Sequence, residues 1–481
     1  MPSDAAPYPA PRRWAPKWLI LTHRWVGIVM GLLMLVWFLS GVVMLFVRWP
    51  DVTPQERAAG LPPITWTACC DLGAAQPAQA VESATVEDLA GRPVLRFDGQ
   101  VLDLSTGAPV EQVAADDAIQ VARAFAAAHG ILGAPARTDR IERDQWTVTG
   151  YFNKGRPFHR IRFDDARATD IYVSARTGLV AQVTDRPTRI LNWLGPIPHW
   201  LYPQVLRANT ALWTQVVIWT SVVGTFLTLT GLYLGIIAWR PRSRPGRGLR
   251  LTPYRGWMAW HHLGGLAAGV LTLTWVASGL VSMNPWGLLE SRADDRGATL
   301  AGGMTLGDLQ AAIASEAVQD LDTRQIVAAP LGGRLFLMAD GERLDSTGRS
   351  APLTAPDLAL AAARLGPATE AAMLTEEDAY HYGHHAPVLL PVYRVILTDG
   401  VRFYLDPASG RIVRRVDAAG RGYRWLFEAP HRLDFIRGFD RGPGWATAMV
   451  LLLAAAALSV VTGIWLGWRR VSADVLKRSN K

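Results

Sequence analysis

Four long uncharged stretches constrain the fold of this 481-residue chain more than any other feature. They contain no Asp, Glu, Lys or Arg, and each exceeds the roughly 20 residues that a helix needs to cross a bilayer. They run from Trp25 to Val47, from Ala208 to Trp239, from Leu263 to Leu289 and from Gly442 to Trp468. The first is too long for a removed signal peptide and lacks a clear small-residue cleavage site, so we interpret it as an anchor. The sequence therefore predicts four membrane-spanning helices.

The distribution of charge predicts how these helices are oriented. Segments 1–24, 240–258 and 469–481 together carry a net charge of +13, whereas the two large loops carry −5. By the positive-inside rule we expect both termini and the Arg-rich segment 240–250 on the cytoplasmic side, and both large loops outside. The excess of basic residues reflects this topology, so we do not interpret it as nucleic-acid binding.

The chain is an internal duplication. Residues 23–44 and 261–282 align without a gap and are identical at nine of 22 positions, including His23 and His261. A second alignment, offset by 232 residues, matches His199 with His431 and the Trp-Pro pattern before each of them. Each half therefore brings one histidine to each end of a pair of membrane helices.

The two large loops repeat each other as well. Residues 94–107 resemble 335–348, and 170–185 match 402–417. Each of these segments has the pattern of strand, Gly turn and strand that is typical of a β-hairpin. Between the hairpins, the Ala-rich segments 116–130 and 356–366 have helical spacing. Each loop is therefore expected to form a small α+β domain.

Two histidines that face each other across a pseudo-twofold axis suit the two axial positions of a haem iron. We expect His23 and His261 to form such a pair near the cytoplasmic face. His199 and His431 follow prolines, which favour the first turn of a helix, and would form a second pair at the outer face from the start of short interfacial helices. The alternatives are an interfacial histidine that caps a helix and a surface histidine in a Pro-Trp cluster.

Cysteine usage decides how any haem would be held. The sequence has no C-x-x-C-H, so haem would be bound non-covalently, as haem b, with two haems per chain. The two cysteines, Cys69 and Cys70, are neighbours in the first loop and are poorly placed for a relaxed bridge, so we interpret them as two loop thiols.

Further polar residues flank the two pairs. His262 replaces Arg24 in the second copy, and is a candidate substitute ligand or propionate partner. An arginine side chain can make bidentate contacts to a carboxylate, so the arginines beside the two sites are candidate partners of the haem propionates. The alternative is that they anchor the helices at the membrane interface. They are Arg24, Arg189, Arg421, Arg424 and Arg432.

The sequence YHYGHHAP, residues 380–387, breaks the symmetry between the copies, because the stretch aligned with it, 151–161, has only His159. His381, His384 and His385 could bind a metal if the segment were helical, although Gly383 and Pro387 argue against a helix. We interpret the three histidines as a candidate catalytic site where a substrate meets the outer haem. A solvated loop is the alternative.

Five runs of the sequence resemble proteins with PepSY-associated transmembrane helices. They are residues 260–286, 390–395, 403–413, 423–435 and 462–470. The resemblance implies a four-span α-helical membrane bundle, built from two duplicated helix pairs, with two periplasmic α+β PepSY-like domains. Relatives of this kind include inner-membrane proteins of iron and siderophore uptake, some of them di-haem reductases of iron chelates.

The uncharged stretches and the charge distribution, together with this resemblance, give the expected organisation of the chain in a bacterial inner membrane. A cytoplasmic N-terminus (1–17) precedes the first span (18–47) and the first periplasmic domain (48–188). An interfacial segment with the second span (189–239), a basic cytoplasmic loop (240–258), the third span (259–286) and the second periplasmic domain (287–420) follow. A second interfacial segment with the fourth span (421–468) and a basic tail (469–481) complete the chain.

The expected function is a transmembrane di-haem ferric-chelate reductase, which passes electrons outward to a periplasmic iron chelate such as siderophore iron. The cytoplasmic segments are too short for a flavin domain and contain no G-x-G-x-x-G, so the donor would be quinol or a separate cytoplasmic protein. One alternative is a haem-free, membrane-anchored structural or regulatory protein that binds a periplasmic partner. Another is a component of iron-chelate transport, which the lack of charged residues inside the spans disfavours.

Overall fold

The computed structural model describes residues 16–66, 68–239, 242–244, 248–383, 387–435 and 442–479. Within these residues, four helices are long and apolar enough to cross a membrane, as the uncharged stretches predict. They are α1 (Lys17–Met44), α7 (Thr210–Ala238), α8 (Trp257–Ser282) and α15 (Pro443–Ser479). The chain is thus a multi-pass membrane protein, and α15 continues beyond Trp468 into the segment expected to be a tail.

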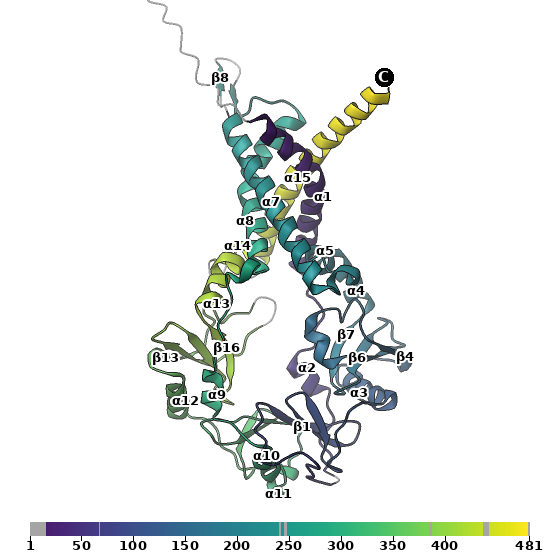
Figure 1. Ribbon diagram of the computed structural model, residues 1–481, viewed down its shortest axis with the longest axis vertical. Helices are drawn as coiled ribbons and strands as arrows, with labels where there is room; N and C mark the ends of the chain where they lie inside the picture. The colour runs from purple at the N-terminus through teal and green to yellow at the C-terminus, as the bar shows by residue number, and fades with distance from the viewer. Residues whose placement is uncertain are drawn as a thin grey trace, which may run out of the picture. The chain divides into compact units, whose positions relative to one another are not determined.

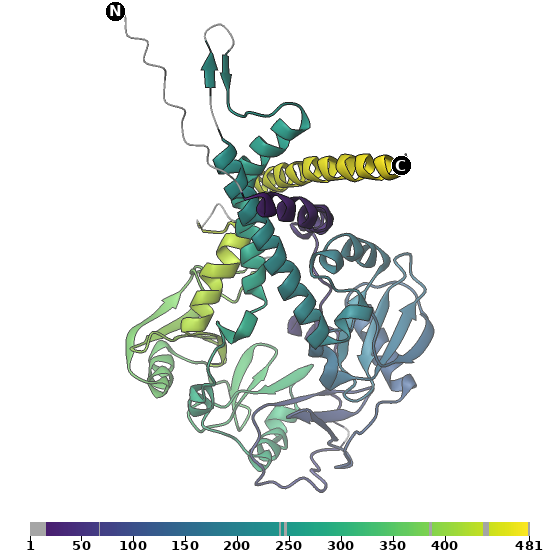
Figure 2. The same cartoon turned by 45° about the horizontal axis from the view of Figure 1, so that its top comes forward.

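The chain divides into two compact units. The membrane unit comprises residues up to Val47, Trp193–Leu288 and Tyr423 onward, and the loop unit comprises Arg48–Asn192 and Leu289–Gly422. In the membrane unit, α1 packs against α7 and α15, and α8 packs against the same two helices (Figures 1 and 2). Helices α1 and α8 contain the aligned segments 23–44 and 261–282, and each of them contacts both α7 and α15.

Short helices precede the second helix of each pair. Before α7 they are α4 (Arg186–Leu194), α5 (Pro196–His199) and α6 (Gln204–Arg207). Before α15 they are α13 (Ala418–Tyr423), a π-helical segment (Arg424–Glu428) and α14 (Ala429–Arg432). Because α5 packs against α1 and α14 packs against α8, the two copies again match. A hairpin of β8 (Arg242–Arg244) and β9 (Gly248–Arg250) joins α7 to α8, and a 3-10 turn (Pro285–Gly287) follows α8.

Each loop forms an antiparallel four-stranded sheet next to its predicted Ala-rich helix. The first has the order β4-β5-β6-β7, and the second has the order β13-β14-β15-β16. The strands are β4 (Pro135–Ile141), β5 (Phe158–Phe163), β6 (Asp170–Ser174), β7 (Val180–Thr184), β13 (Ala368–Leu374), β14 (Val392–Leu397), β15 (Arg402–Leu405) and β16 (Ile412–Val416). The helices are α3 (Ala115–Ala128) and α12 (Ala355–Ala362). The predicted hairpins at 170–185 and 402–417 are confirmed as β6-β7 and β15-β16.

The other two predicted hairpins form one sheet together. This joint sheet has the order β12-β11-β10-β1-β2-β3, because β1 pairs with β10 across the two loops. Its strands are β1 (Ala84–Asp88), β2 (Pro93–Phe97), β3 (Gln100–Asp103), β10 (Gln325–Ala328), β11 (Phe336–Ala339) and β12 (Glu342–Asp345). The expectation of one separate domain per loop is therefore wrong for these hairpins.

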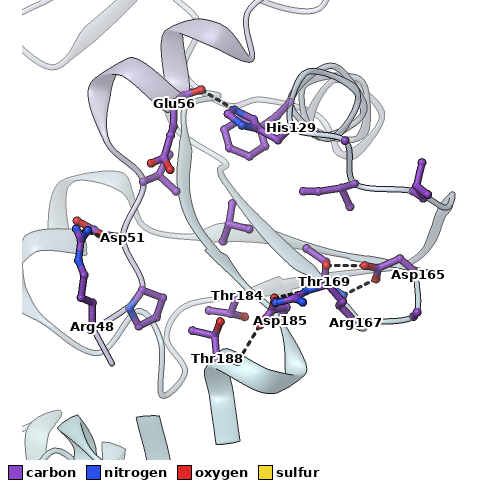
Figure 3. A pocket seen from close by; sticks show the side chains of 18 of the residues that line it. Arg48, Asp51, Glu56, His129, Asp165, Arg167, Thr169, Thr184, Asp185 and Thr188 are labelled. Atoms are coloured by element: carbon purple, nitrogen blue, oxygen red, sulfur yellow. Dashed lines mark hydrogen bonds and ion pairs between the residues drawn. The ribbon is translucent and has the colours of Figure 1, made fainter. Parts of the chain in front are cut away.

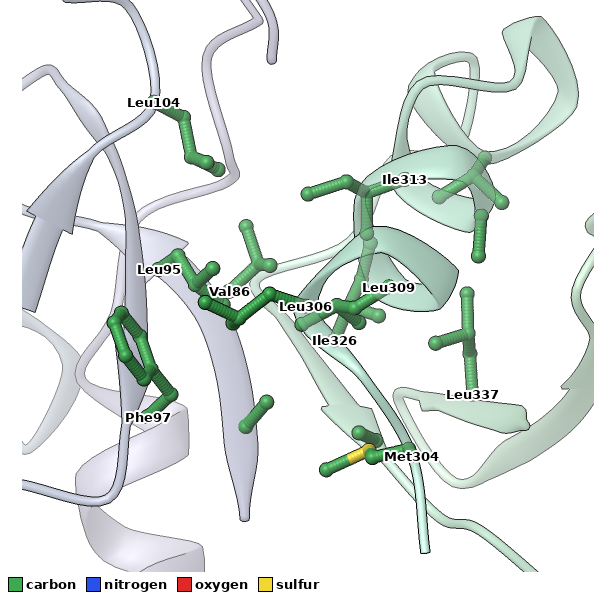
Figure 4. Packing of buried hydrophobic residues seen from close by; sticks show 14 of the residues in the cluster. Val86, Leu95, Phe97, Leu104, Met304, Leu306, Leu309, Ile313, Ile326 and Leu337 are labelled. Atoms are coloured by element: carbon green, nitrogen blue, oxygen red, sulfur yellow. The ribbon is translucent and has the colours of Figure 1, made fainter. Parts of the chain in front are cut away.

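Apolar packing explains why the two loops join. Val86 and Leu95 from the first loop and Leu309, Ile326 and Leu337 from the second loop belong to one buried cluster (Figure 4). Each of these side chains is at most 1 % exposed. Since a hairpin alone exposes one apolar face, pairing β1 with β10 buries both faces in one core.

Short helices complete the loop unit. They are α2 (Pro54–Ala59), α9 (Arg296–Ala301), α10 (Leu306–Ile313) and α11 (Glu316–Gln319), with 3-10 turns at Gly150–Gly155 and Ala363–Leu365.

Cys69 and Cys70 differ from the expectation of two thiols, because the structure joins them by a disulfide. Both side chains pack against the cluster of the joint sheet. The Cys70 carbonyl accepts a hydrogen bond from Gln310 Nε2 on α10, which fixes the segment to its surroundings.

Candidate functional site

The bundle brings the four predicted histidines together in two pairs. His23 of α1 and His261 of α8 have ring centres 6.4 Å apart, with an angle of 39° between the ring planes. His199 of α5 and His431 of α14 have ring centres 6.2 Å apart, with an angle of 76°. We call these the inner and the outer pair. His199 and His431 lie at or near the C-terminal ends of their short helices, whereas the prolines predicted the helix starts.

In every ring, Nδ1 is held by a backbone carbonyl and a hydroxyl oxygen of a facing helix. The partners are Leu227 and Thr230 for His23, Ser459 and Thr462 for His261, Trp37 and Ser40 for His199, and Trp275 and Ser278 for His431. A carbonyl only accepts, so Nδ1 carries the hydrogen and Nε2 carries the lone pair. No described residue forms a hydrogen bond with any of the four Nε2 atoms. Each pair therefore presents the nitrogen that a metal requires.

The ring spacing fits a metal ion between each pair. A bond between a first-row metal and an imidazole nitrogen is about 2.0 Å long, and that nitrogen lies about 1.1 Å from its ring centre, so two rings on opposite sides of one ion have centres about 6.2 Å apart. The observed spacings of 6.4 and 6.2 Å match this value. The inclined planes exclude face-to-face stacking in both pairs, and edge-to-face packing of two rings, with centres about 4.5–7 Å apart, is the alternative to a shared ion. The residues present therefore fit bis-histidine haem ligation.

Glycines provide the space for the inner rings. A Cβ placed on Gly231 would lie 2.6 Å from Cε1 of His23, and one on Gly463 would lie 2.8 Å from Cε1 of His261. In the outer pair, Gly41 and Gly279 approach His199 and His431 less closely, at 3.5 and 3.7 Å. All four glycines are duplicated between the copies. Gly231 and Gly463 thus shape the inner site, a role that the sequence pattern alone did not identify.

The two pairs are separated along the bundle. His23 is a residue of α1, and His199 contacts Trp37 and Ser40 of the same helix. A helix rises about 1.5 Å per residue, so 14 to 17 residues correspond to about 23 Å. The apolar cluster that includes Met30, Met34 and Trp275 fills the bundle interior. The two sites therefore lie toward opposite ends of a bilayer core about 30 Å thick.

Burial keeps the outer histidines neutral. It lowers the pKa of His199 to about 4 and that of His431 to about 3, from an ordinary value of 6.5. Neutral imidazole is the form that binds a metal. The outer pair is therefore in its ligating form at pH 7 without losing a proton.

His262 is engaged elsewhere. Its Nδ1 contacts Thr252 Oγ1 at 2.9 Å, and its Nε2 contacts the Gly235 carbonyl at 2.9 Å. With both nitrogens bonded, the ring connects the segment before α8 to the end of α7, and neither nitrogen is left for iron. This arrangement favours a structural role over the predicted one in cofactor binding.

The arginines near the pairs differ in their surroundings. Arg24 is exposed on α1. Arg432 lies 3.7 Å from Glu428, and the buried Arg424 donates to Asp434. In the loop unit, Arg189 donates to Asp170 and Arg421 donates to the Gly400 carbonyl. Among these predicted propionate partners, Arg24 is exposed, whereas the other four contact groups of the protein.

His381 lies inside the loop unit and is 4 % exposed. Its Nε2 contacts the Leu389 carbonyl, and its ring stacks on Tyr404. Its backbone N–H donates to Asp378, which also accepts from Tyr404 and Arg394. The predicted catalytic role of His381 is therefore not supported by its position, because the ring is packed in a core. His384 and His385 lie outside the described residues.

The hydrogen bonds around Asp378 have a counterpart around Asp144 in the first loop, and this comparison accounts for the position of His381. Asp144 accepts from the Thr147 backbone N–H and from Tyr172, and lies 3.7 Å from Arg160. Asp378, Tyr404 and Arg394 repeat this cluster, and the backbone N–H of His381 takes the place of that of Thr147. The structural counterpart of His381 is thus Thr147, and the alignment of residues 380–387 with 151–161 is corrected.

A cavity of about 670 Å³ opens in the first loop, within the range of small-molecule sites (Figure 3). Its charged groups are engaged within the protein: Arg48 with Asp51, Arg167 with Asp185, and Asp165 with Thr169. His129, which caps α3 as predicted, contacts the Glu56 carbonyl at its rim. Because both basic and acidic side chains line the cavity, it does not indicate whether a ligand would be an anion or a cation.

Comparison with known proteins is informative at the level of the family. None of the curated proteins matches this chain. The family model described as the PepSY-associated TM region matches residues 20–384, which is more than half of the chain and includes His23, His199 and His261. The chain therefore belongs to the family of proteins with PepSY-associated transmembrane regions.

Proposed function

We propose that this protein is a bacterial inner-membrane haem-b oxidoreductase that passes electrons across the membrane to a periplasmic ferric chelate. The observation that carries the proposal is the ring spacing in the two histidine pairs, 6.4 and 6.2 Å, where each pair joins one histidine to its aligned counterpart in the other half of the chain. When bound, haem supplies a one-electron iron couple at each pair. Both termini are assigned to the cytoplasm by the positive-inside rule.

The residues of the chain have separate tasks in this proposal. His23 and His261 hold the inner site, and His199 and His431 hold the outer site, each through Nε2. Apolar side chains of the bundle, Met30, Met34 and Trp275 among them, exclude water from the interior. A dry protein shell around each site tunes its redox behaviour and limits side reactions.

The substrate and the donor follow from the chemistry at the two faces. An outer site that carries one electron at a time suits an acceptor with a one-electron couple, such as chelated ferric iron. Quinol or a separate cytoplasmic protein is the proposed donor. The family resemblance supports iron chelates, including siderophore iron, as the substrate class.

A vesicle assay tests the proposal. Purified protein is reconstituted in liposomes and its haem is reduced with a quinol analogue. The impermeant complex ferric nitrilotriacetate is then added outside, and haem reoxidation is followed in the α-band together with external Fe(II). We expect both signals at matched rates, and we expect His199→Ala to retain a reducible inner haem but to produce little external Fe(II).

Two outcomes would contradict the proposal. Haem that stays reduced in the presence of the external chelate would exclude outward transfer to this substrate class. Colourless wild-type protein from haem-replete cells would favour the haem-free alternative, a membrane-anchored protein that binds a periplasmic partner.

A further inference from the structure

The four histidines share one hydrogen-bond pattern. The duplication explains why the two histidines of one pair are alike, but it does not explain why the inner and the outer pair share the pattern. In each case, the carbonyl of residue i and the hydroxyl of residue i+3 on one helix both lie at the Nδ1 of the histidine. The pairs are Leu227 with Thr230, Ser459 with Thr462, Trp37 with Ser40, and Trp275 with Ser278. Two of the helices, α7 and α15, serve the inner site, and the other two, α1 and α8, serve the outer site.

The direction of each hydroxyl hydrogen is fixed by the helix. Thr230 Oγ1 donates to the Leu227 carbonyl at 2.8 Å, and Thr462 Oγ1 donates to the Ser459 carbonyl at 2.6 Å. Ser278 Oγ donates to the Trp275 carbonyl at 3.1 Å in the same way. Since the hydrogen of the hydroxyl is used within its own helix, its oxygen is left to accept from the histidine. The Nδ1–H of each ring is therefore shared between two acceptors.

We infer that Thr230, Thr462, Ser40 and Ser278 are positioning residues of the haem ligands. Each fixes the ring with Nδ1–H toward the helix and Nε2 toward the iron, and each adds electron density to the imidazole through the shared hydrogen. A more electron-rich imidazole stabilises ferric iron, so each hydroxyl lowers the reduction potential of its haem. This inference rests on the proposed haem ligation and adds the residues that tune it.

Helix α7 offers a matched pair of threonines for the test. Thr228 and Thr230 are buried to a similar degree, at 8 % and 6 % exposed, and both donate to a backbone carbonyl of α7. Thr230 contacts His23, whereas Thr228 has no contact with a histidine among the described residues. Thr228→Val therefore controls for the loss of a buried hydroxyl from this helix.

The experiment is a potentiometric titration of the α-band in the purified full-length protein, with haem quantitation on the same samples. Thr230→Val is expected to retain both haems and to shift the potential of one of them upward. Thr228→Val is expected to leave both potentials unchanged, and Thr230→Ser to restore the wild-type value because it keeps the hydroxyl.

Three results would overturn the inference: unchanged potentials in Thr230→Val, an equal shift in Thr228→Val, or no restoration in Thr230→Ser. All three require wild-type protein with two haems. Wild-type protein without haem is instead a failure of the proposed function, so the two failures are distinguishable.

Discussion

Gly231 of α7 lies against the imidazole of His23, so that a Cβ at this position would approach Cε1 to 2.6 Å. A contact this short requires either the ring or the helix to move. Because the imidazole is the ligand of the proposed inner haem, this glycine determines whether the ring can hold its orientation.

Gly231→Ala should therefore weaken inner haem binding and leave the outer haem in place, giving close to one haem per chain. Gly27→Ala is the control, since its added Cβ would lie 3.7 Å from the nearest atom, an ordinary van der Waals contact. Haem quantitation on both purified variants makes the comparison. Two haems in Gly231→Ala would show that the inner ring tolerates displacement.

A substitution of His262, the residue that follows His261, tests whether it takes part in haem ligation. Both of its ring nitrogens are bonded, to Thr252 and Gly235. We expect His262→Gln to keep both haems and an unchanged α-band, whereas His261→Ala should lose the inner haem. Loss of one haem in His262→Gln would assign His262 a ligand role after all.

The two haems should differ in electron paramagnetic resonance. The ring planes meet at 39° in the inner pair and at 76° in the outer pair, and the angle between axial imidazoles sets the splitting of the ferric iron orbitals. The oxidised protein should therefore show a rhombic low-spin signal and a more axial one. His431→Ala should remove the more axial signal. A spectrum in which the two haems are indistinguishable would contradict the different plane angles.

Asp378 provides a test of the loop unit. Burial alone would raise the pKa of Asp378, but the hydrogen bonds from the Tyr380 backbone, Tyr404 and Arg394 outweigh this effect and lower it. An unfolded Asp titrates near pH 3.9, so its stabilising effect is complete above about pH 4 and is lost as the pH falls through the folded value.

At pH 7, Asp378→Asn should destabilise the second loop by roughly 3 kcal/mol, because it leaves the buried side of Arg394 without its carboxylate. Limited proteolysis of the full-length protein in nanodiscs measures the effect, with the exposed Glu376→Gln as the control. The difference between Asp378→Asn and wild type should decrease below about pH 4. An equal difference at pH 7 and pH 3 would contradict the role of the carboxylate.

Local patterns predicted much of this structure. The absence of charge over more than 20 residues specifies a membrane helix, and strands with a Gly turn specify hairpins, so α1, α7, α8, α15 and the predicted hairpins appear where expected. The pairing of β1 with β10 depends on which apolar faces meet in three dimensions, and no local pattern contains that information.

In the candidate site too, local patterns predicted some features, whereas others depend on packing in three dimensions. The duplication identified His23 and His261 as equivalent, and their spacing in the bundle agrees with a shared ligand. Thr230 and Thr462 were visible only as repeated residues, because their role depends on the facing helix. For His381 the local pattern suggested a metal site, because several histidines follow each other closely. In the structure, His381 instead lies in a core that is organised around Asp378.

Haem quantitation combined with an absorbance spectrum tests the central claim most directly. Full-length wild-type protein, purified from haem-replete cells, should show a reduced b-type spectrum with close to two haems per chain, and His23→Ala and His199→Ala should each retain one. Wild-type protein without haem, or loss of both haems in either variant, would contradict two independent histidine pairs.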